Sequence, residues 1–82
     1  MGKSKVVDVH IHVYRAVLRM SQRELAEKVG VARQTIIKIE RNKQNPSLLL
    51  IHDIAEVLGV TIEQLYTFGE EENETEKTVE LE

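Results

Sequence analysis

The order of apolar and polar residues along the chain predicts several short helices. Ser21 and Glu24 have the S-x-x-E spacing of a capping box, which would begin a helix at Gln22. Gly30 suits the left-handed position that ends a helix. Segment 22–29 is therefore predicted to be a helix of about two turns.

A second helix is predicted directly after the first. At ~100° per residue, Ile36 and Ile39 share one face of segment 33–41, and most polar side chains share the other. Asn42 suits the position that stops this helix, because asparagine tolerates the left-handed conformation better than most residues. Two short helices joined by a tight Gly-Val turn result.

A longer helix is predicted after the single proline. Pro46 suits a turn or a first helical position, and Gly59 would end the helix after Leu58. Apolar residues cover about half of its circumference, so this helix should face a core. Leu49 stands apart, because it falls in the middle of the polar side.

A last short helix is predicted over 62–68. Thr61 and Gln64 repeat the capping-box spacing at its start, and its apolar content includes Tyr66 and Phe68. No helical pattern continues beyond this segment.

Residues 7–14, VDVHIHVY, alternate strictly between apolar and polar side chains. Read as a half-buried strand, the stretch would carry His10 and His12 on one face, and such a pair is half of a metal site. Read as a helix, it would be the first of the series. The alternation alone does not decide between the two readings.

Charge is distributed unevenly along the chain. The net charge is −3, but seven glutamates and one lysine give residues 70–82 a charge of −6. Residues 1–45 hold ten lysines or arginines against four acidic residues, which gives +6. The sequence therefore predicts a basic surface able to face phosphate groups.

The glutamate-rich segment 70–82 has too few apolar residues to build a core, so we expect a solvated extension. A weak alternation at 77–81 leaves pairing with residues 5–9 as an alternative. The acidic charges would either compete with phosphate for the basic surface or bind a partner protein.

Composition excludes several protein classes. The chain has 82 residues, 41% of them hydrophobic, which suits one small domain. The longest apolar run, 48–51, is far shorter than a membrane span of ~20 residues, and the N-terminus lacks a secretory signal. With no cysteine in the chain, we expect a cytoplasmic protein.

Enzymatic chemistry is not expected. The three histidines have no nucleophile or carboxylate partner at a recognisable spacing, and no glycine-rich phosphate loop is present. We therefore predict no cofactor, no metal and no catalytic residue.

Segment 11–65 closely resembles the phage-repressor-type helix-turn-helix family, also called XRE-type or lambda-repressor-like. The resemblance rests on motifs that occur together and in order, which are Ser21-Gln22, Leu25-Ala26, Gly30-Val31, Gln34-Thr35-Ile36, Ile39-Glu40, Asn45-Pro46-Ser47 and Ile54-Ala55. It implies an all-α fold of five short helices with residues 22–41 as the helix-turn-helix. The implied boundaries are a lead-in at 1–8, the domain at 9–69 and the acidic tail at 70–82.

The resemblance implies a sequence-specific, double-stranded DNA-binding regulator, in which helix 33–41 enters the major groove. Residues carried over by position as base-reading candidates are Arg33, Gln34 and Lys38, with Thr35 and Ile37 secondary. Their chemistry agrees, because Arg and Lys suit guanine and Gln suits adenine. The phosphate-contact candidates are Gln22, Arg41, Asn42 and Lys43.

The resemblance also assigns a structural pair and exposes departures. Arg15 and Glu40 match residues that form an ion pair between the first and third helices. Ala32 stands where Ser or Thr usually caps the recognition helix. Other departures are Arg19 and Asn42, which stand where glycine is common, and Ile37 and Leu49, which replace polar residues.

For the first helix, the resemblance favours the helical reading of 7–14. Ile11, Tyr14 and Leu18 have helical spacing, which continues past the point where the alternation breaks. Asp8 then becomes the expected cap, and His10 and His12 lie roughly 200° apart, too far around the helix to share an ion. Only residues 5–7 remain candidates for extended structure.

A small domain cannot easily bury all of the apolar surface of Leu49, Tyr66 and Phe68. We therefore expect a homodimer that meets through the fourth and fifth helices. As a repressor, this dimer would read a pseudo-palindrome with half-sites ~34 Å apart. The alternative is a protein-interaction module, such as an antitoxin whose acidic tail binds a partner protein.

Overall fold

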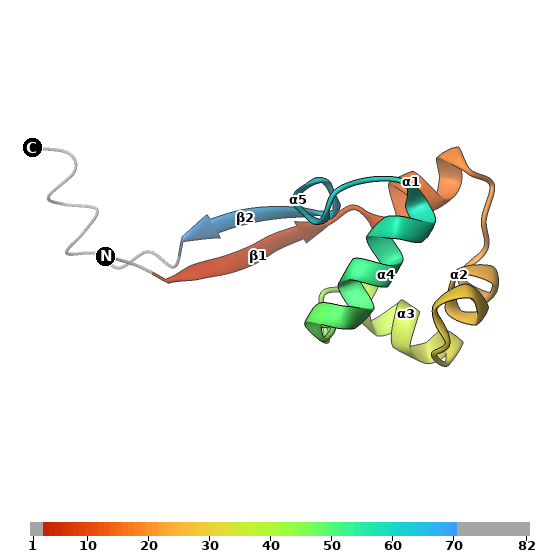
Figure 1. Cartoon of the computed structure of the whole chain (residues 1–82). Helices are drawn as coiled ribbons and strands as arrows, with labels where there is room; N and C mark the ends of the chain where they lie inside the picture. Colours follow the sequence, from red (N-terminus) through yellow and green to blue (C-terminus); the bar gives the residue numbers. More distant parts are fainter. Residues whose placement is uncertain (1–2, 71–82) are drawn as a thin grey trace, which may run out of the picture.

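The computed structural model describes residues 3–70, which form five helices and two strands. In chain order these are β1 (Ser4–Val9), α1 (Ile11–Val17), α2 (Gln22–Val29), α3 (Arg33–Glu40), α4 (Leu48–Leu58), α5 (Ile62–Leu65) and β2 (Tyr66–Glu70). The predicted five-helix fold is confirmed. Figure 1 shows the helices gathered into one body and the two strands projecting from it as a ribbon.

The predicted helix starts of α2 and α5 are confirmed in atomic detail. Ser21 Oγ accepts a hydrogen bond from the Glu24 N–H at 3.0 Å, and the Glu24 carboxylate accepts one from the Ser21 N–H at 2.9 Å. Thr61 and Gln64 form the same reciprocal pair at α5. Each box supplies side-chain acceptors for two backbone N–H groups at the start of the helix.

The predicted helix ends are also present. Gly30 follows α2 with φ 76° and Gly59 follows α4 with φ 74°, both in the left-handed region. Asn42 has φ 57° after α3, although α3 ends at Glu40, one residue earlier than predicted. Pro46 lies in the turn rather than in the helix, because Ser47 caps α4 by accepting from the Leu50 N–H at 3.2 Å.

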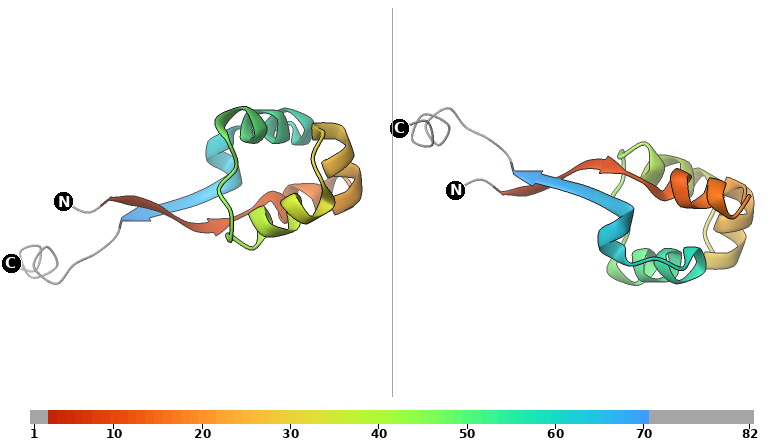
Figure 2. Two further views of the ribbon diagram at one scale, coloured as in Figure 1. Left: turned by 90° about the horizontal axis from the view of Figure 1, so that it is seen from below. Right: turned by 90° about the horizontal axis from the view of Figure 1, so that it is seen from above.

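The core lies where the helices meet around α4. No polar residue among the described ones is buried. The buried apolar residues lie on β1 and on all five helices, and they are Val9, Ile11, Leu25, Ala26, Ile36, Ile39, Ile51, Ile54, Ala55, Leu58 and Leu65. Figure 2 shows α3 and α4 on opposite sides of the body, with the ribbon leaving between them. This core fixes the position of α2 against α3, because both helices bury their apolar faces in it.

The predicted cap at Asp8 is wrong. Residues through Val9 form β1, and α1 begins at Ile11. The Asp8 carboxylate instead accepts a hydrogen bond from the Val9 N–H at 2.9 Å. The β-branched valines of this stretch suit a strand, and a partner strand supplies the hydrogen bonds that a helix would otherwise provide.

The prediction that the last helix reaches Phe68 is also wrong. The helix ends at Leu65, and β2 follows as an antiparallel partner of β1. The Cα partners are Ser4 and Glu70, Lys5 and Gly69, Val6 and Phe68, Asp8 and Thr67, and Val9 and Tyr66. Residues 4–9 thus pair with 66–70, while 77–81, the alternative partner considered above, lie outside the described residues.

The ribbon contains a β-bulge and a close approach. Val7 is the extra residue of β1, because the register shifts between Val6 and Asp8. A side chain at Gly69 would place its Cβ only 2.8 Å from Val7 Cγ2. Glycine at this position therefore lets the Val7 side chain lie across β2. None of the helices within residues 3–70 is long and apolar enough to cross a membrane.

Candidate nucleic-acid interface

The outer face of α3 carries the residues predicted to read bases. Arg33, Gln34 and Lys38 are exposed, and Thr35 and Ile37 are partly buried beside them. Ile36 and Ile39 are buried on the opposite face, which holds the helix against the core. A helix fixed on one side and polar on the other can enter a DNA groove without disturbing the fold.

The turn between α2 and α3 is short and internally bonded. The N–H of Val31 donates to the Ala26 carbonyl at 3.0 Å, which closes the end of α2 around Gly30. Ala32 precedes α3, and its side chain makes no capping hydrogen bond. The Thr35 N–H donates to the Ala32 carbonyl at 3.0 Å, whereas the N–H groups of Arg33 and Gln34 have no partner within residues 3–70 and lie next to the face that would meet an anion.

Arg15 and Glu40 form an ion pair between α1 and the end of α3. Arg15 Nε lies 2.6 Å from Glu40 Oε2, and Arg15 Nη2 donates to Glu40 Oε1 at 3.1 Å. A third nitrogen, Nη1, donates to the Met20 carbonyl at 2.9 Å. Both side chains are largely buried, so this two-pronged contact orients α3 rather than facing solvent.

Gln22 extends the same network toward the predicted DNA-reading face. Its Nε2 donates to Glu40 Oε1 at 3.0 Å, and its Oε1 lies 3.5 Å from Arg33 Nη2. Gln22 is partly buried between these two residues. Its amide therefore links the buried carboxylate of Glu40 to the exposed guanidinium of Arg33.

A shallow hollow of about 660 Å³ lies at the start of α2. It is lined by Arg15, Ser21, Gln22, Arg23 and Arg33. Arg23 and Arg33 give it positive charge, since Arg15 is paired with Glu40, and the first N–H groups of α2 lie beside them, a combination that favours a phosphate. Arg23 was missed in the sequence analysis, although its place in the first turn of α2 next to Gln22 was the available signal.

The segment after α3 carries the other predicted phosphate contacts. Arg41, Asn42 and Lys43 are exposed. Asn42 has a structural partner as well, because its Nδ2 donates to the Val6 carbonyl of β1 at 3.2 Å. Lys43 lines a second hollow, of about 480 Å³, together with Lys5 of β1. The structure brings these two lysines to one surface between the ribbon and the end of α3.

The three residues predicted to form a dimer contact lie on different elements. Leu49 is on α4 and 75% exposed, whereas Tyr66 and Phe68 are on β2. Tyr66 is partly buried against the core, and its ring centroid lies 5.7 Å from that of Phe68. The Tyr66 hydroxyl is buried with no hydrogen-bond partner among the described residues, and burial raises the pKa of Tyr66 above its usual 10.0.

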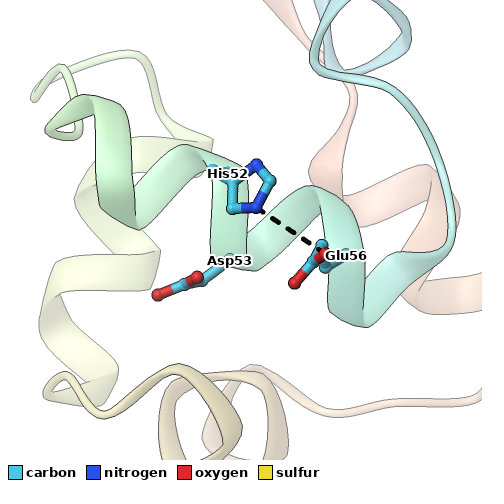
Figure 3. Close-up of side chains that lie close together, drawn as sticks. All are labelled: His52, Asp53 and Glu56. Carbon is cyan, nitrogen blue, oxygen red and sulfur yellow. Dashed lines mark ion pairs between the residues drawn. The ribbon is translucent and has the colours of Figure 1, made fainter.

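His52, Asp53 and Glu56 lie together on the exposed side of α4, as Figure 3 shows. His52 Nε2 is 3.6 Å from Glu56 Oε2, a pair four residues apart on one helix. The expectation that no histidine has a carboxylate partner is therefore wrong, and the spacing of 52 and 56 was the signal. All three side chains face solvent, which suits a surface helix pair.

The comparisons agree with this geometry. A model of the family described as Helix-turn-helix matches residues 14–65. An uncharacterised HTH-type transcriptional regulator of Archaeoglobus fulgidus is 50% identical over 62 residues, covering 76% of this chain and 89% of that protein.

Solved structures of the regulator SinR are similar as well. A crystal structure of SinR in complex with DNA has a TM-score of 0.60 and 42% identity, covering 65% of this chain and 86% of that one. A SinR–SinI protein complex has a TM-score of 0.61 and 36% identity, covering 87% and 72%. By its sequence match, its fold and these relatives, the chain belongs to the helix-turn-helix family of DNA-binding transcriptional regulators.

Proposed function

We propose that this protein is a transcriptional regulator that binds a specific sequence in double-stranded DNA through α3. The observation that carries the proposal is the arrangement of α3, whose buried face is locked by the core and by the Arg15–Glu40 pair while its polar face is free. The relative SinR, crystallised with DNA, supports the same conclusion.

In this proposal the exposed face of α3 reads base edges. Arg33 and Lys38 would address guanine O6 and N7, and Gln34 would address adenine N6 and N7. Thr35 and Ile37 are less exposed and would contribute apolar contacts, for example to a thymine methyl group.

Two basic surfaces on either side of α3 would hold the phosphate backbone. One is the hollow at the start of α2, with Gln22 and Arg23. The other is the segment after α3, with Arg41, Asn42 and Lys43. Such contacts set the position of the protein on the duplex and add affinity without reading sequence.

We further propose a homodimer that acts as a repressor on a pseudo-palindromic site. Two recognition helices related by a twofold axis would meet half-sites one helical turn apart, ~34 Å. The large exposed side chains Leu49 of α4 and Phe68 of β2 offer two alternative interfaces, since either would gain from burial.

Selection of bound sites from random duplex DNA, followed by two alanine variants, tests the proposal. Arg33→Ala should relax specificity at one base pair by about 1–3 kcal/mol. Lys43→Ala should instead weaken binding to all sequences alike and lower the slope of log affinity against log salt by about one. If the two variants change specificity and salt dependence in the same way, the division between base and phosphate contacts is wrong.

A second candidate function is binding of a partner protein through the acidic segment 70–82. The similarity to SinR in its complex with the SinI protein favours this candidate. A second small protein that co-purifies with the full chain and is lost on removal of the acidic residues would support it. Co-purification that survives their removal would contradict it.

A further inference from the structure

The ribbon has two outer edges, and they differ. An antiparallel pair leaves each strand with one row of N–H and C=O groups that point away from its partner. On β1 this row is interrupted by the bulge at Val7, and the Val6 carbonyl already accepts a hydrogen bond from Asn42. The outer edge of β1 is therefore partly closed.

The hydrogen bonds fix which groups of β2 point outward. The His10 N–H donates to the Leu65 carbonyl at 2.7 Å, so Leu65 faces β1 at the base of the ribbon. The direction of the backbone N–H and C=O groups alternates along a strand. These groups therefore also point toward β1 at Thr67 and Gly69, and away from β1 at Tyr66, Phe68 and Glu70. The outward Val6 carbonyl gives the same result independently, since Val6 is the partner of Phe68.

Within residues 3–70 no strand pairs with the outer edge of β2, and Glu70 at its end is the only charged residue on it. The sequence YTFGE has no proline, no lysine and no bulge, and Phe68 at its centre is 54% exposed. Figure 1 shows this edge along the upper side of the projecting ribbon. Natural edges of this kind are normally blocked or paired, and a ribbon of only two strands gains stability from further strands.

We propose that β2 pairs antiparallel with β2 of a second copy about a twofold axis at Phe68, which joins two ribbons into one four-stranded sheet. This inference rests on the homodimer proposed above and names its interface. The partner is a second copy because the edge is complementary to itself. In this register Phe68 meets Phe68 of the second copy, and Tyr66 meets Glu70.

Chemistry at each pair supports the register. Each residue of β2 whose backbone groups point outward is paired with another such residue of the second copy. A shift of the axis to Thr67 or Gly69 would leave one of these residues without a pairing partner. Two Phe68 rings side by side, each close to its own Tyr66, form an aromatic cluster. Glu70 faces a tyrosine, so no like charges stand opposite each other.

The same register spaces the two helical bodies. The 5 residues of β2 span ~17 Å at ~3.3 Å per residue, so about one ribbon length would separate the bodies. A dimer built in this way holds two recognition helices apart instead of packing the bodies directly together. The distance between the two recognition helices is this ~17 Å plus the distance from each ribbon base to its α3, so it exceeds ~17 Å, as half-sites ~34 Å apart require.

A charge swap at Phe68 tests the interface in the full chain. Phe68→Lys and Phe68→Glu each place two like charges opposite each other at the axis, so each variant alone should lose the dimer in sedimentation analysis at micromolar concentration. An equal mixture should regain it as a heterodimer, because opposite charges then meet. Recovery on mixing also shows that both variants are folded.

The same two substitutions at Leu49 provide the matched control, because Leu49 is exposed on α4 and outside the proposed sheet. Leu49→Lys and Leu49→Glu should remain dimeric, each alone. The proposal is overturned if the wild-type chain is a monomer, if the Phe68 variants remain dimeric, if their mixture stays monomeric, or if only the Leu49 variants lose the dimer. Binding of wild-type protein to random duplex DNA is measured separately, and its absence would refute the DNA-binding proposal alone.

Discussion

At the scale of single residues, two side chains occupy backbone conformations that usually belong to glycine. Arg19 has φ 55° after α1 and Asn42 has φ 57° after α3. For a residue with a Cβ this conformation costs roughly 1–2 kcal/mol, less for asparagine. Asn42 has a compensation, its hydrogen bond to the Val6 carbonyl, whereas the Arg19 side chain makes no hydrogen bond within residues 3–70.

Glycine substitutions should therefore act differently at the two positions. Arg19→Gly is expected to raise the free energy of unfolding by about 0.5–1 kcal/mol, since relief of strain exceeds the added flexibility of the unfolded chain. Asn42→Gly should give no such gain, because it also removes a hydrogen bond worth about 1 kcal/mol. Urea denaturation measures both, and equal gains would show that Asn42 does not stabilise the ribbon.

Residue chemistry was also where prediction from sequence was most successful. The glycine-like positions at Arg19 and Asn42 and the uncapped start at Ala32 stood out against the family pattern, and each has the corresponding geometry. The bond from Asn42 to Val6 was not predictable, because it joins residues 36 apart in sequence. A side chain that fits one role locally can thus acquire a second role through the fold.

At the scale of elements, α2 and α5 begin with capping boxes of different chemistry. The box of α2 uses the carboxylate of Glu24, and the box of α5 uses the amide of Gln64. Hydrogen bonds from the Ser21 backbone and side chain hold the pKa of Glu24 below its usual 4.5. Only the α2 box should therefore respond to acid.

The direction of that response follows from the lowered pKa. Because the unfolded chain binds the proton more readily, Glu24 stabilises the fold above pH ~4.5 and loses this contribution as the pH falls through its folded-state pKa. Thermal denaturation between pH 6 and pH 3 should show a smaller drop for Glu24→Gln than for wild type, since glutamine keeps the box without a titrating group. An equal drop in both proteins would mean that Glu24 is not a source of acid sensitivity.

Elements whose signals are local were predicted well, and those that depend on a distant partner were not. The starts of α2 and α5 and the ends of α2 and α4 follow from residues three or four apart. The strands did not, because β1 and β2 are stable only through each other, across more than fifty intervening residues. The alternation of VDVHIHVY was a true strand signal through Val9, and it ends where α1 begins.

At the scale of the whole molecule, charge is divided between the basic domain and the acidic segment beyond it. Residues 71–82 hold six glutamates and one lysine, a charge of −5. They lie outside the described residues, but their charge acts over roughly 10 Å at moderate ionic strength. This segment would then compete with phosphate for the basic surfaces beside α3.

Truncation after Glu70 should tighten binding to random duplex DNA at low salt by several-fold, and the effect should fade as salt is added. The cut keeps Glu70, the partner of Ser4, so the ribbon stays intact. Fluorescence anisotropy with labelled random duplex measures the change. A chain with residues 71–82 present but their glutamates changed to glutamine should behave like the truncated one, and unchanged affinity in both would exclude competition.

The pairing of the first described element with the last also shapes how the molecule assembles. Joining β1 to β2 closes a loop that contains all five helices of the described residues. The chain therefore loses the conformational entropy of that closure before the hydrogen bonds between the strands can compensate for it. The helices, whose contacts are nearer in sequence, are therefore expected to form first and the ribbon last. In native-state hydrogen exchange on the monomer, the amides of the ribbon should exchange faster than those of α4. The ribbon would then unfold locally while the helices that it encloses stay folded.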